Sequence, residues 1–177
     1  RVGRLGTVDV SFPGEQGSVS NRMTTPEAPE VQRLLARMVE AGCDWAVVES
    51  TSHGLALNRL DDVEYDIAGF TNVTGDHLDF HKTFEAYREA KGRLFGMLAT
   101  SWDKGREKVA VVNDDDPNAN FMRSQSPARA LSYGIESRDA DVLARDISLH
   151  ATGSDFRLVT AQGSADVALQ IPAIFNV

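Results

Sequence analysis

The sequence predicts an α/β protein with a mostly parallel sheet flanked by helices, and two observations carry that prediction. Short continuous apolar runs, typical of strands buried on both faces of a parallel sheet, alternate with segments whose apolar residues recur every three or four positions. Toward the carboxyl end the pattern changes to short alternating segments separated by glycines, which favours antiparallel strands. The expected fold class is therefore α/β with short antiparallel strands in its C-terminal part.

The apolar runs at 45–48, 67–73 and 109–112 are the predicted parallel strands. Shorter alternating segments at 141–150, 156–160 and 167–171 are the predicted antiparallel strands. Residues 7–12, followed by Pro13-Gly14, are typical of a hairpin or an ordered loop.

Three helices are expected. The first carries an apolar stripe, for which either Thr25 before Pro26 or Thr24 paired with Glu27 provides a cap, and Gly42 ends it. The second spans 83–98, and the third spans 117–123 with Asp116 as its cap. The stripe of the first helix consists of Val31, Leu34, Leu35, Met38 and Val39.

Length and charge limit the possible classes of protein. With 177 residues, 42% of them hydrophobic, the chain is long enough for one domain, which we expect to cover residues 1–177 and to be cut at both ends out of a longer protein. A net charge of −8 argues against binding to nucleic acid or to an anionic membrane surface. No apolar run has the length of a membrane span. Cys43 is the only cysteine, which predicts a buried thiol and a cytoplasmic protein.

Polar residues follow each predicted parallel strand. Glu49 follows the first, Asn72 and the stretch 74–77 follow the second, and Asn113 follows the third. Because ligands of open α/β sheets bind beyond the carboxyl ends of the strands, these residues predict one polar site. For the three acids at 114–116 we prefer a purely structural interpretation, as a turn and a cap.

Lys91 occupies an unusual position in the second helix. The apolar stripe there runs through Tyr87 and Leu94, and Lys91 completes the spacing between them. Because a buried unpaired ammonium is costly, this lysine must reach out to solvent, pair with an acid, lose its proton or be modified.

The stretch 76–81 contains two acids and two histidines. His77 and His81 have the spacing of helical zinc ligands, but Leu78 stands where a metalloprotease needs glutamate. A hard oxygen ligand such as Glu49 instead favours Mg²⁺, which relies on waters and substrate phosphates for its remaining ligands. Ser52 beside His53 lacks the surroundings of a hydrolase nucleophile, and the chain contains no phosphate-binding loop of the Gly-x-x-x-x-Gly-Lys-Ser/Thr type.

These residues resemble the Mur ligase family, and within it the enzymes that add the third residue of the bacterial cell-wall peptide. The resemblance extends over nearly the whole chain, and the DHLDFH stretch with its downstream lysine is its most specific part. The matching stretches are Leu5-Gly6-Thr7, Thr24-Thr25-Pro26, ESTSHGL at 49–55, Arg59, FTNVTGDHLDFH at 70–81, Tyr87-Arg88-Glu89-Ala90-Lys91 and Phe175-Asn176-Val177.

The resemblance implies an ATP-dependent ligase of peptidoglycan precursor synthesis. Such enzymes activate a substrate carboxylate as an acyl phosphate, and the amine of an amino acid then attacks it to form an amide. Glu49, His77 and Lys91 match the Mg²⁺ ligands, with Lys91 carbamylated, so that a buried cation becomes an anion that a metal can neutralise.

The resemblance also implies the partners. Positions that hold UDP-N-acetylmuramoyl-dipeptide are matched by Thr24, Thr25, Thr51 and Arg59, and Asn176 matches an asparagine near the adenine of ATP. The second substrate is a free amino acid, read by a C-terminal domain, and the phosphate loop is expected just upstream of Arg1. Ala173 departs from the family pattern, which usually has glycine there.

Two other functions remain open. One is a related amide ligase of the cyanophycin or folylpolyglutamate type. The match of Thr24, Thr25 and Arg59 to positions that contact the muramoyl-peptide argues against this function. The other is a non-catalytic module that binds a nucleotide-peptide. In either ligase case we expect the 177 residues alone to turn over ATP poorly, because positioning in phosphoryl transfer depends on the missing parts.

Overall fold

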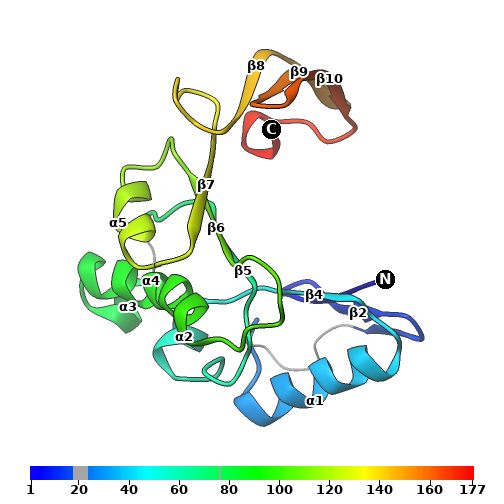
Figure 1. The fold of residues 1–177 in the computed structure, drawn as a ribbon, viewed down its shortest axis with the longest axis vertical. Helices are drawn as coiled ribbons and strands as arrows, with labels where there is room; N and C mark the ends of the chain where they lie inside the picture. Colours follow the sequence, from blue (N-terminus) through cyan, green and yellow to red (C-terminus); the bar gives the residue numbers. More distant parts are fainter. Residues whose placement is uncertain (18–23, 76) are drawn as a thin grey trace. The chain divides into compact units, whose positions relative to one another are not determined.

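The computed structural model describes residues 1–17, 24–75 and 77–177, which form two compact units (Figure 1). Unit 1 comprises residues 1–65 and 75–102, and unit 2 comprises residues 66–74 and 103–177. Each unit has its own sheet and helices, and together they confirm the α/β class.

Unit 1 contains a four-stranded sheet in the order β3-β2-β1-β4. Its strands are β1 (Val2–Leu5), β2 (Val10–Phe12), β3 (Glu15–Gly17) and β4 (Trp45–Val48). β1 pairs in parallel with β4 and antiparallel with β2, while β2 and β3 form the hairpin expected around Pro13-Gly14.

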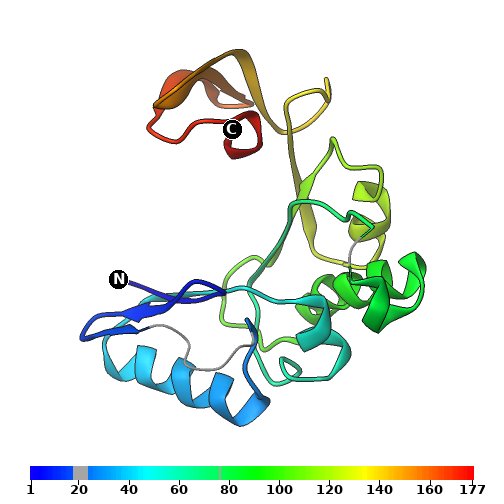
Figure 2. The same cartoon turned by 180° about the vertical axis from the view of Figure 1, so that it is seen from behind.

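The helix α1 (Ala28–Glu40) covers one face of this sheet (Figure 2). Its approach to β1 is close, since a Cβ atom on Gly3 would lie 2.5 Å from Met38 Sδ. The predicted end at Gly42 is confirmed: Gly42 has φ +73°, and the amides of Gly42 and Cys43 donate to the carbonyls of Val39 and Met38, which is the Schellman pattern.

Both predicted caps of α1 are wrong. The residue before the helix is Glu27, whose side chain makes no capping hydrogen bond, and Pro29 in the first turn lacks an amide that would need a cap. Val39, expected in the buried stripe, is 74% exposed. Cys43, predicted to be buried, is only half-buried because it follows the turn that ends the helix.

β4 is a strand as predicted, but it is not buried on both faces. Trp45 and Val47 are 46% and 58% exposed, since α1 covers only the other face of the sheet. β4 also belongs to a different sheet from the next two predicted strands, so sheet pairing alone does not bring their ends together.

Three helices complete unit 1: α2 (Ser52–Ala56), α3 (Leu78–His81) and α4 (Phe84–Thr100). The predicted helix from Thr83 is confirmed as α4, with the Thr83 hydroxyl accepting from the Ala86 amide. α2 and α3 are too short to show an apolar period, and both pack on α4.

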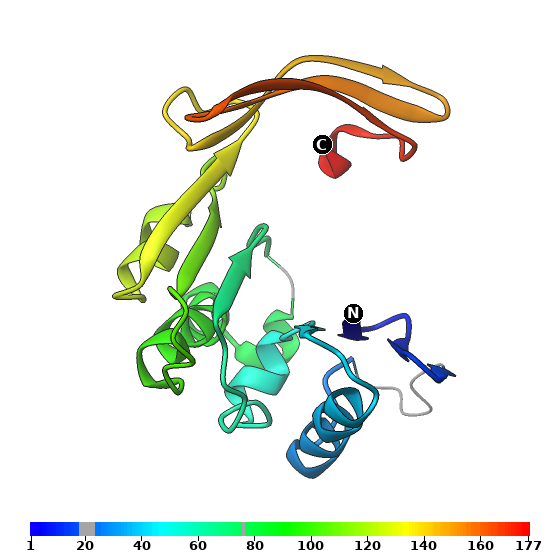
Figure 3. The same cartoon turned by 45° about the vertical axis from the view of Figure 1, so that its right-hand side comes forward.

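Unit 2 contains a six-stranded sheet in the order β10-β9-β8-β7-β6-β5. The pairs from β5 to β8 are parallel, and β8, β9 and β10 form a curved antiparallel ribbon (Figure 3), as expected for the C-terminal part. The strands are β5 (Ile67–Phe70), β6 (Val109–Asn113), β7 (Arg129–Gly134), β8 (Val142–His150), β9 (Gly153–Thr160) and β10 (Gly163–Leu169).

Some sequence predictions for unit 2 need correction. β5 ends at Phe70 rather than Val73, and its residues alternate between exposed and buried because only one face of the strand is covered. β7 was not predicted, since its apolar residues are too few to form a run. α5 (Ala119–Ser124) starts after Asn118 and not after Asp116, which forms the preceding turn by accepting from the Asn118 amide.

The acids at 114–116 make structural contacts, although none of them caps α5 as predicted. Asp115 accepts hydrogen bonds from the amides of Ile135, Glu136 and Ser137, and Asp114 pairs with Arg123. Within the described part of the chain, no helix has the length and apolarity that crossing a membrane requires.

Candidate functional site

The parallel strands β1 and β4 end side by side, and a polar contact joins the residues that follow them. Thr7 Oγ1 lies 2.8 Å from each carboxylate oxygen of Glu49, and the Thr7 amide donates to Glu49 Oε2 at 2.7 Å. Thr24 Oγ1 lies 3.1 Å from Thr7 Oγ1. A Cβ atom on Gly6 would lie 3.1 Å from Glu49 Oε2, so glycine leaves room for the carboxylate.

A second group of hydroxyls lies at the start of α2. Thr51 caps this helix, accepting from the Gly54 amide, and its Oγ1 lies 2.8 Å from Thr25 Oγ1. Thr25 is 2% exposed, and its hydroxyl also lies 3.2 Å from the Glu49 carbonyl oxygen. Thr25 therefore ties the segment before α1 to the segment between β4 and α2.

Arg59 extends this group. Its Nη1 donates to the Thr25 carbonyl oxygen at 3.2 Å, and its Nη2 lies 2.9 Å from Glu27 Oε1. The Arg59 side chain is 14% exposed, whereas that of Glu27 is 61% exposed. The guanidinium is thus held at the protein surface beside the threonines, with its orientation fixed from two sides.

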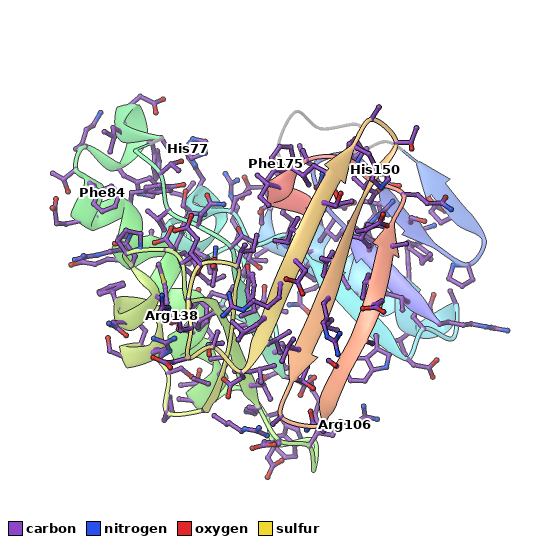
Figure 4. The ribbon with its side chains drawn as sticks, turned by 90° about the horizontal axis from the view of Figure 1, so that it is seen from above. His77, Phe84, Arg106, Arg138, His150 and Phe175 are labelled. Atoms are coloured by element: carbon purple, nitrogen blue, oxygen red, sulfur yellow. The ribbon has the colours of Figure 1, made fainter. Side chains whose placement is uncertain are left out.

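Aromatic and imidazole rings form a cluster where α2, α3 and α4 meet. The His53 ring contacts Phe80, His77 and His81 at centroid distances of 4.1, 5.2 and 5.4 Å. Tyr87 lies 5.8 Å from His77 and 5.3 Å from His81. Figure 4 labels His77 at the start of α3 and Phe84 at the start of α4, in the same corner of unit 1.

His77 and His81 differ in environment although they stand one helical turn apart. His77 is exposed and has φ +57°, a conformation that non-glycine residues seldom adopt and that is frequent at functional sites. His81 is buried, with Nε2 3.0 Å from Ser52 Oγ. Burial lowers the pKa of the His81 imidazole, and His53, His77 and Lys91 act in the same direction while Asp79 opposes them.

Lys91 is half-buried on α4, and its Nζ lies 5.3 Å from the centroid of the Tyr87 ring. A cation above the face of a tyrosine is attracted by the ring quadrupole. The unmodified lysine therefore has a favourable contact within the apolar stripe, and the same ring contacts His77. Tyr87 thus brings together two of the three residues predicted to bind a metal.

The structure groups most of the predicted site residues within unit 1. Thr24 and Glu49 join through Thr7, while Thr25, Thr51 and Arg59 form the second group. Over residues 1–17, 24–75 and 77–177, no three His, Cys, Asp or Glu side chains are grouped closely enough to hold a metal ion. Lys91 is not among these residue types, and Asp76 of the predicted motif lies outside the described residues.

Asn176 lies in unit 2, in a single 3₁₀ turn (Ile174–Asn176), where its Nδ2 donates to the Pro172 carbonyl at 2.5 Å. The residue before this turn, Ala173, has φ +82°, which explains why glycine suits that position.

Sequence reasoning missed the roles of three residues. Thr7 was noted only as part of a matching stretch, although the pairing of β1 with β4 places it on Glu49. The sequence argues against Ser52 as a hydrolase nucleophile and predicts Tyr87 only as a core residue. Their contacts with His81 and Lys91 depend on how three helices pack.

Comparison with known proteins identifies the class. Residues 2–177 match the family described as Mur ligase middle domain, and the chain belongs to that family. It is 46% identical over 184 aligned residues to a UDP-N-acetylmuramyl-tripeptide synthetase of Roseiflexus sp. (strain RS-1), covering 99% of this chain and 36% of the relative.

Two further comparisons agree. The chain is 42% identical to a UDP-N-acetylmuramoyl-L-alanyl-D-glutamate--2,6-diaminopimelate ligase of Bacillus licheniformis, over 100% of this chain and 36% of the relative. A solved structure of a ligase with the same name superposes with a TM-score of 0.82 at 34% identity, over 99% of this chain and 35% of the other. The chain thus spans about 36% of the length of these curated relatives.

Proposed function

We propose that this chain is the central domain, over residues 1–177, of a longer cytoplasmic ligase. In this proposal the enzyme transfers the terminal phosphoryl group of ATP to a D-glutamyl carboxylate of UDP-N-acetylmuramoyl-L-alanyl-D-glutamate, which gives an acyl phosphate and ADP. The amine of an amino acid then attacks the acyl carbon, phosphate leaves, and an amide forms that carries the third residue of the peptide. The names of two relatives that align over almost the entire chain support this reaction.

The observation that carries the proposal is the contact of Thr25 with both Thr51 and Arg59. The segment before α1 meets the residues on either side of α2 here, and Thr51 and Arg59 present groups that suit an anionic substrate. A guanidinium binds carboxylate or phosphate oxygens with paired N–H donors, and a hydroxyl both donates and accepts. We assign binding of the nucleotide-peptide to Thr24, Thr25, Thr51 and Arg59, with the buried Thr25 acting by holding Thr51 and Arg59 in place.

Glu49, His77 and a carbamylated Lys91 are the residues that would hold Mg²⁺. The oxygen donors suit this ion, since the Glu49 carboxylate retains lone pairs beyond those engaged by Thr7, and a carbamate supplies further oxygens. His77 would add an imidazole nitrogen. Bound Mg²⁺ would supply neutralisation of the phosphate charge during transfer. The Tyr87 ring, which contacts both His77 and Lys91, keeps these two side chains close together.

The remaining parts of the reaction belong to the rest of the longer protein in this proposal. A phosphate loop upstream would hold the ATP phosphates, Asn176 would lie near the adenine, and a C-terminal domain would select the amino acid. N- and C-terminal domains of the same polypeptide are therefore the partners of this chain. Alignment with only about a third of each relative supports a multidomain protein.

Phosphate release by the full-length gene product tests the proposal. The enzyme receives ATP, Mg²⁺, UDP-N-acetylmuramoyl-L-alanyl-D-glutamate and a panel of amino acids, among them diaminopimelate and lysine. We expect release that requires both the nucleotide-peptide and one amino acid. The opposite result is a folded enzyme that releases no phosphate with any of these amino acids but releases it with a folate or a cyanophycin primer. That result would favour the related amide ligase over this proposal.

Substitution of Arg59 tests the substrate site directly. Arg59→Lys keeps the charge but loses the paired donors, and we expect the KM for the nucleotide-peptide to rise about tenfold with little change in the KM for ATP. Arg33→Lys is the matched control, because Arg33 forms an ion pair with Glu30 within α1. If both substitutions raise the KM for the nucleotide-peptide equally, Arg59 is not part of the substrate site.

A further inference from the structure

Two short helices of unit 1 are joined by a buried hydrogen bond that the proposed reaction does not use. Ser52 is 3% exposed and His81 is 8% exposed, and Ser52 Oγ lies 3.0 Å from His81 Nε2. Ser52 is the first residue of α2, and His81 is the last residue of α3. Two polar groups buried against each other in this way are costly to separate, because each would lose its partner without regaining water.

Both ends of this hydrogen bond adjoin residues of the proposed site. Ser52 directly follows Thr51, whose hydroxyl caps α2 and contacts Thr25. On the other side, the His81 amide donates to the His77 carbonyl at 3.0 Å, so His77 and His81 belong to one helical turn. The His77 and His81 rings also share two neighbours, His53 and Tyr87.

The α3 turn needs such a restraint, because its backbone is strained at both ends. His77 before it has φ +57°, and Lys82 after it has φ +68°. Neither residue is glycine, and conformations of this kind persist only where the surroundings hold them in place. A four-residue helix has too few internal hydrogen bonds to do so by itself.

We propose that the Ser52–His81 hydrogen bond is a positioning latch, which fixes the α3 turn and its His77 ring against the segment that carries Thr51. His81 and Ser52 are then positioning residues: they touch neither substrate nor metal and act through His77 and Thr51. This inference rests on the proposed function in two respects: that His77 binds Mg²⁺ and that Thr51 binds the nucleotide-peptide.

The first test measures NMR resonances of the histidine side chains and does not need enzyme activity. The chain contains four histidines, so their side-chain ¹⁵N and ¹³C resonances can be assigned one by one through His→Gln variants. Ser52→Ala removes the hydrogen bond with the smallest change in side-chain shape. We expect the chemical shifts of His81 and His77 to change and that of His150, in unit 2, to remain the same. Tyr65→Phe, the matched control, removes another buried hydroxyl contact of unit 1, to Ser50 at 2.9 Å, and should leave His77 unchanged. If His77 is unmoved in Ser52→Ala, the latch does not position it.

The second test uses the full-length enzyme. We expect Ser52→Ala and His81→Asn each to raise the Mg²⁺ concentration for half-maximal rate about tenfold, as replacement of residues that orient metal ligands typically does. The double variant should be no worse than either single variant, because both remove one interaction. Tyr65→Phe should lose some thermal stability but keep the wild-type Mg²⁺ dependence.

The outcomes separate the two proposals. A wild-type enzyme without ligase activity overturns the proposed function, while the histidine resonances still decide whether the latch exists. An active wild type whose Ser52→Ala and Tyr65→Phe variants share the same Mg²⁺ dependence overturns the latch alone. Additive effects of Ser52→Ala and His81→Asn would also overturn it, since the two residues would then act separately.

Discussion

A Cβ atom on Gly54 would lie 2.6 Å from Thr25 Cγ2 and 3.0 Å from Thr25 Oγ1. The glycine therefore lets α2 approach the segment before α1 so closely that the Thr25 and Thr51 hydroxyls meet at 2.8 Å. Because Thr25 is buried and bonded on several sides, it has little room to move away.

We predict that Gly54→Ala destabilises unit 1. Alanine favours a helix over glycine by about 1 kcal/mol, but forcing a methyl group into a packed contact costs about 1–3 kcal/mol, and here the contact is too short for a small shift. The net loss should appear as a lower urea midpoint followed by tryptophan fluorescence. This signal reports unit 1, because both tryptophans, Trp45 and Trp102, lie in it.

Gly75→Ala is the control for that experiment. Nothing lies within 4 Å of a Cβ atom at Gly75, and its φ is not positive. The free energy of unfolding of Gly75→Ala should therefore stay within about 0.5 kcal/mol of wild type. Equal stability of Gly54→Ala and Gly75→Ala would show that the α2 contact yields more easily than the distances indicate.

We predict that Ala173→Gly stabilises the 3₁₀ turn at Ile174–Asn176. Ala173 has φ +82°, which is strained for any residue with a Cβ atom, and relief of such strain is worth about 1 kcal/mol. The Asn176 amide, which donates to the Ala173 carbonyl at 3.1 Å, should exchange with solvent more slowly. Ala165→Gly in β10, where φ is ordinary, should instead weaken its strand, and faster exchange at Asn176 in Ala173→Gly would refute the prediction.

We predict that Asp115 contributes to stability at neutral pH and that the contribution is lost in acid. Burial acts to raise the pKa of this carboxyl, but hydrogen bonds from the Ile135, Ser137 and Glu136 amides and the charge of Arg145 outweigh it, so the pKa is lowered. With the folded pKa below the unfolded value near 3.9, the stabilisation is complete above about pH 4 and disappears as the pH falls through the folded pKa.

Asp115→Asn should therefore cost about 1–2 kcal/mol at pH 7, a figure reduced by partial solvent screening, and should flatten the loss of stability below pH 4. Unfolding followed by circular dichroism from about pH 7 to pH 2 measures this. The control is Asp139→Asn, which removes an exposed carboxylate from the loop between β7 and β8. If the free energy of unfolding falls as steeply below pH 4 in Asp115→Asn as in wild type, the stabilising role assigned to Asp115 is wrong.

We predict that Lys91 takes up carbon dioxide when Mg²⁺ is present. The Tyr87 ring attracts the ammonium at 5.3 Å but disfavours an anion, so the carbamate needs a metal to neutralise it. With ¹³C-labelled bicarbonate, the full-length enzyme should show a carbamate resonance that depends on Mg²⁺ and is absent in Lys91→Arg. Persistence of the signal in Lys91→Arg would place the modification elsewhere.

Much of the fold was predictable because periodic apolar residues report local burial. The helix from Thr83, the glycine end of α1, the hairpin before it and the C-terminal antiparallel strands all follow from patterns within a dozen residues. β7 and the caps of α1 were not predictable in this way, since β7 has a weak pattern and Thr25 bonds to residues far along the chain instead of to its own helix.

The candidate site, like the fold, was only partly predictable from the sequence. The stretches that match the Mur ligases selected the predicted site residues, and the comparison of the whole chain confirms its family. Those residues include Thr25, Thr51, Arg59, His77 and Lys91. The resemblance did not reveal that Thr7 bonds to Glu49, that the Tyr87 ring contacts both His77 and Lys91, or that Ser52 bonds to His81.

The sequence by itself determined the α/β class, the position of the lysine in an apolar stripe and the membership of the Mur ligase family. Tertiary structure alone decided which hydroxyls meet, which backbone amides donate to Asp115 and which histidine is buried. The physical reason is that apolar periodicity is a local property of the chain. A hydrogen bond between residues such as Ser52 and His81, in contrast, exists only once separate helices have packed and excluded water from between them.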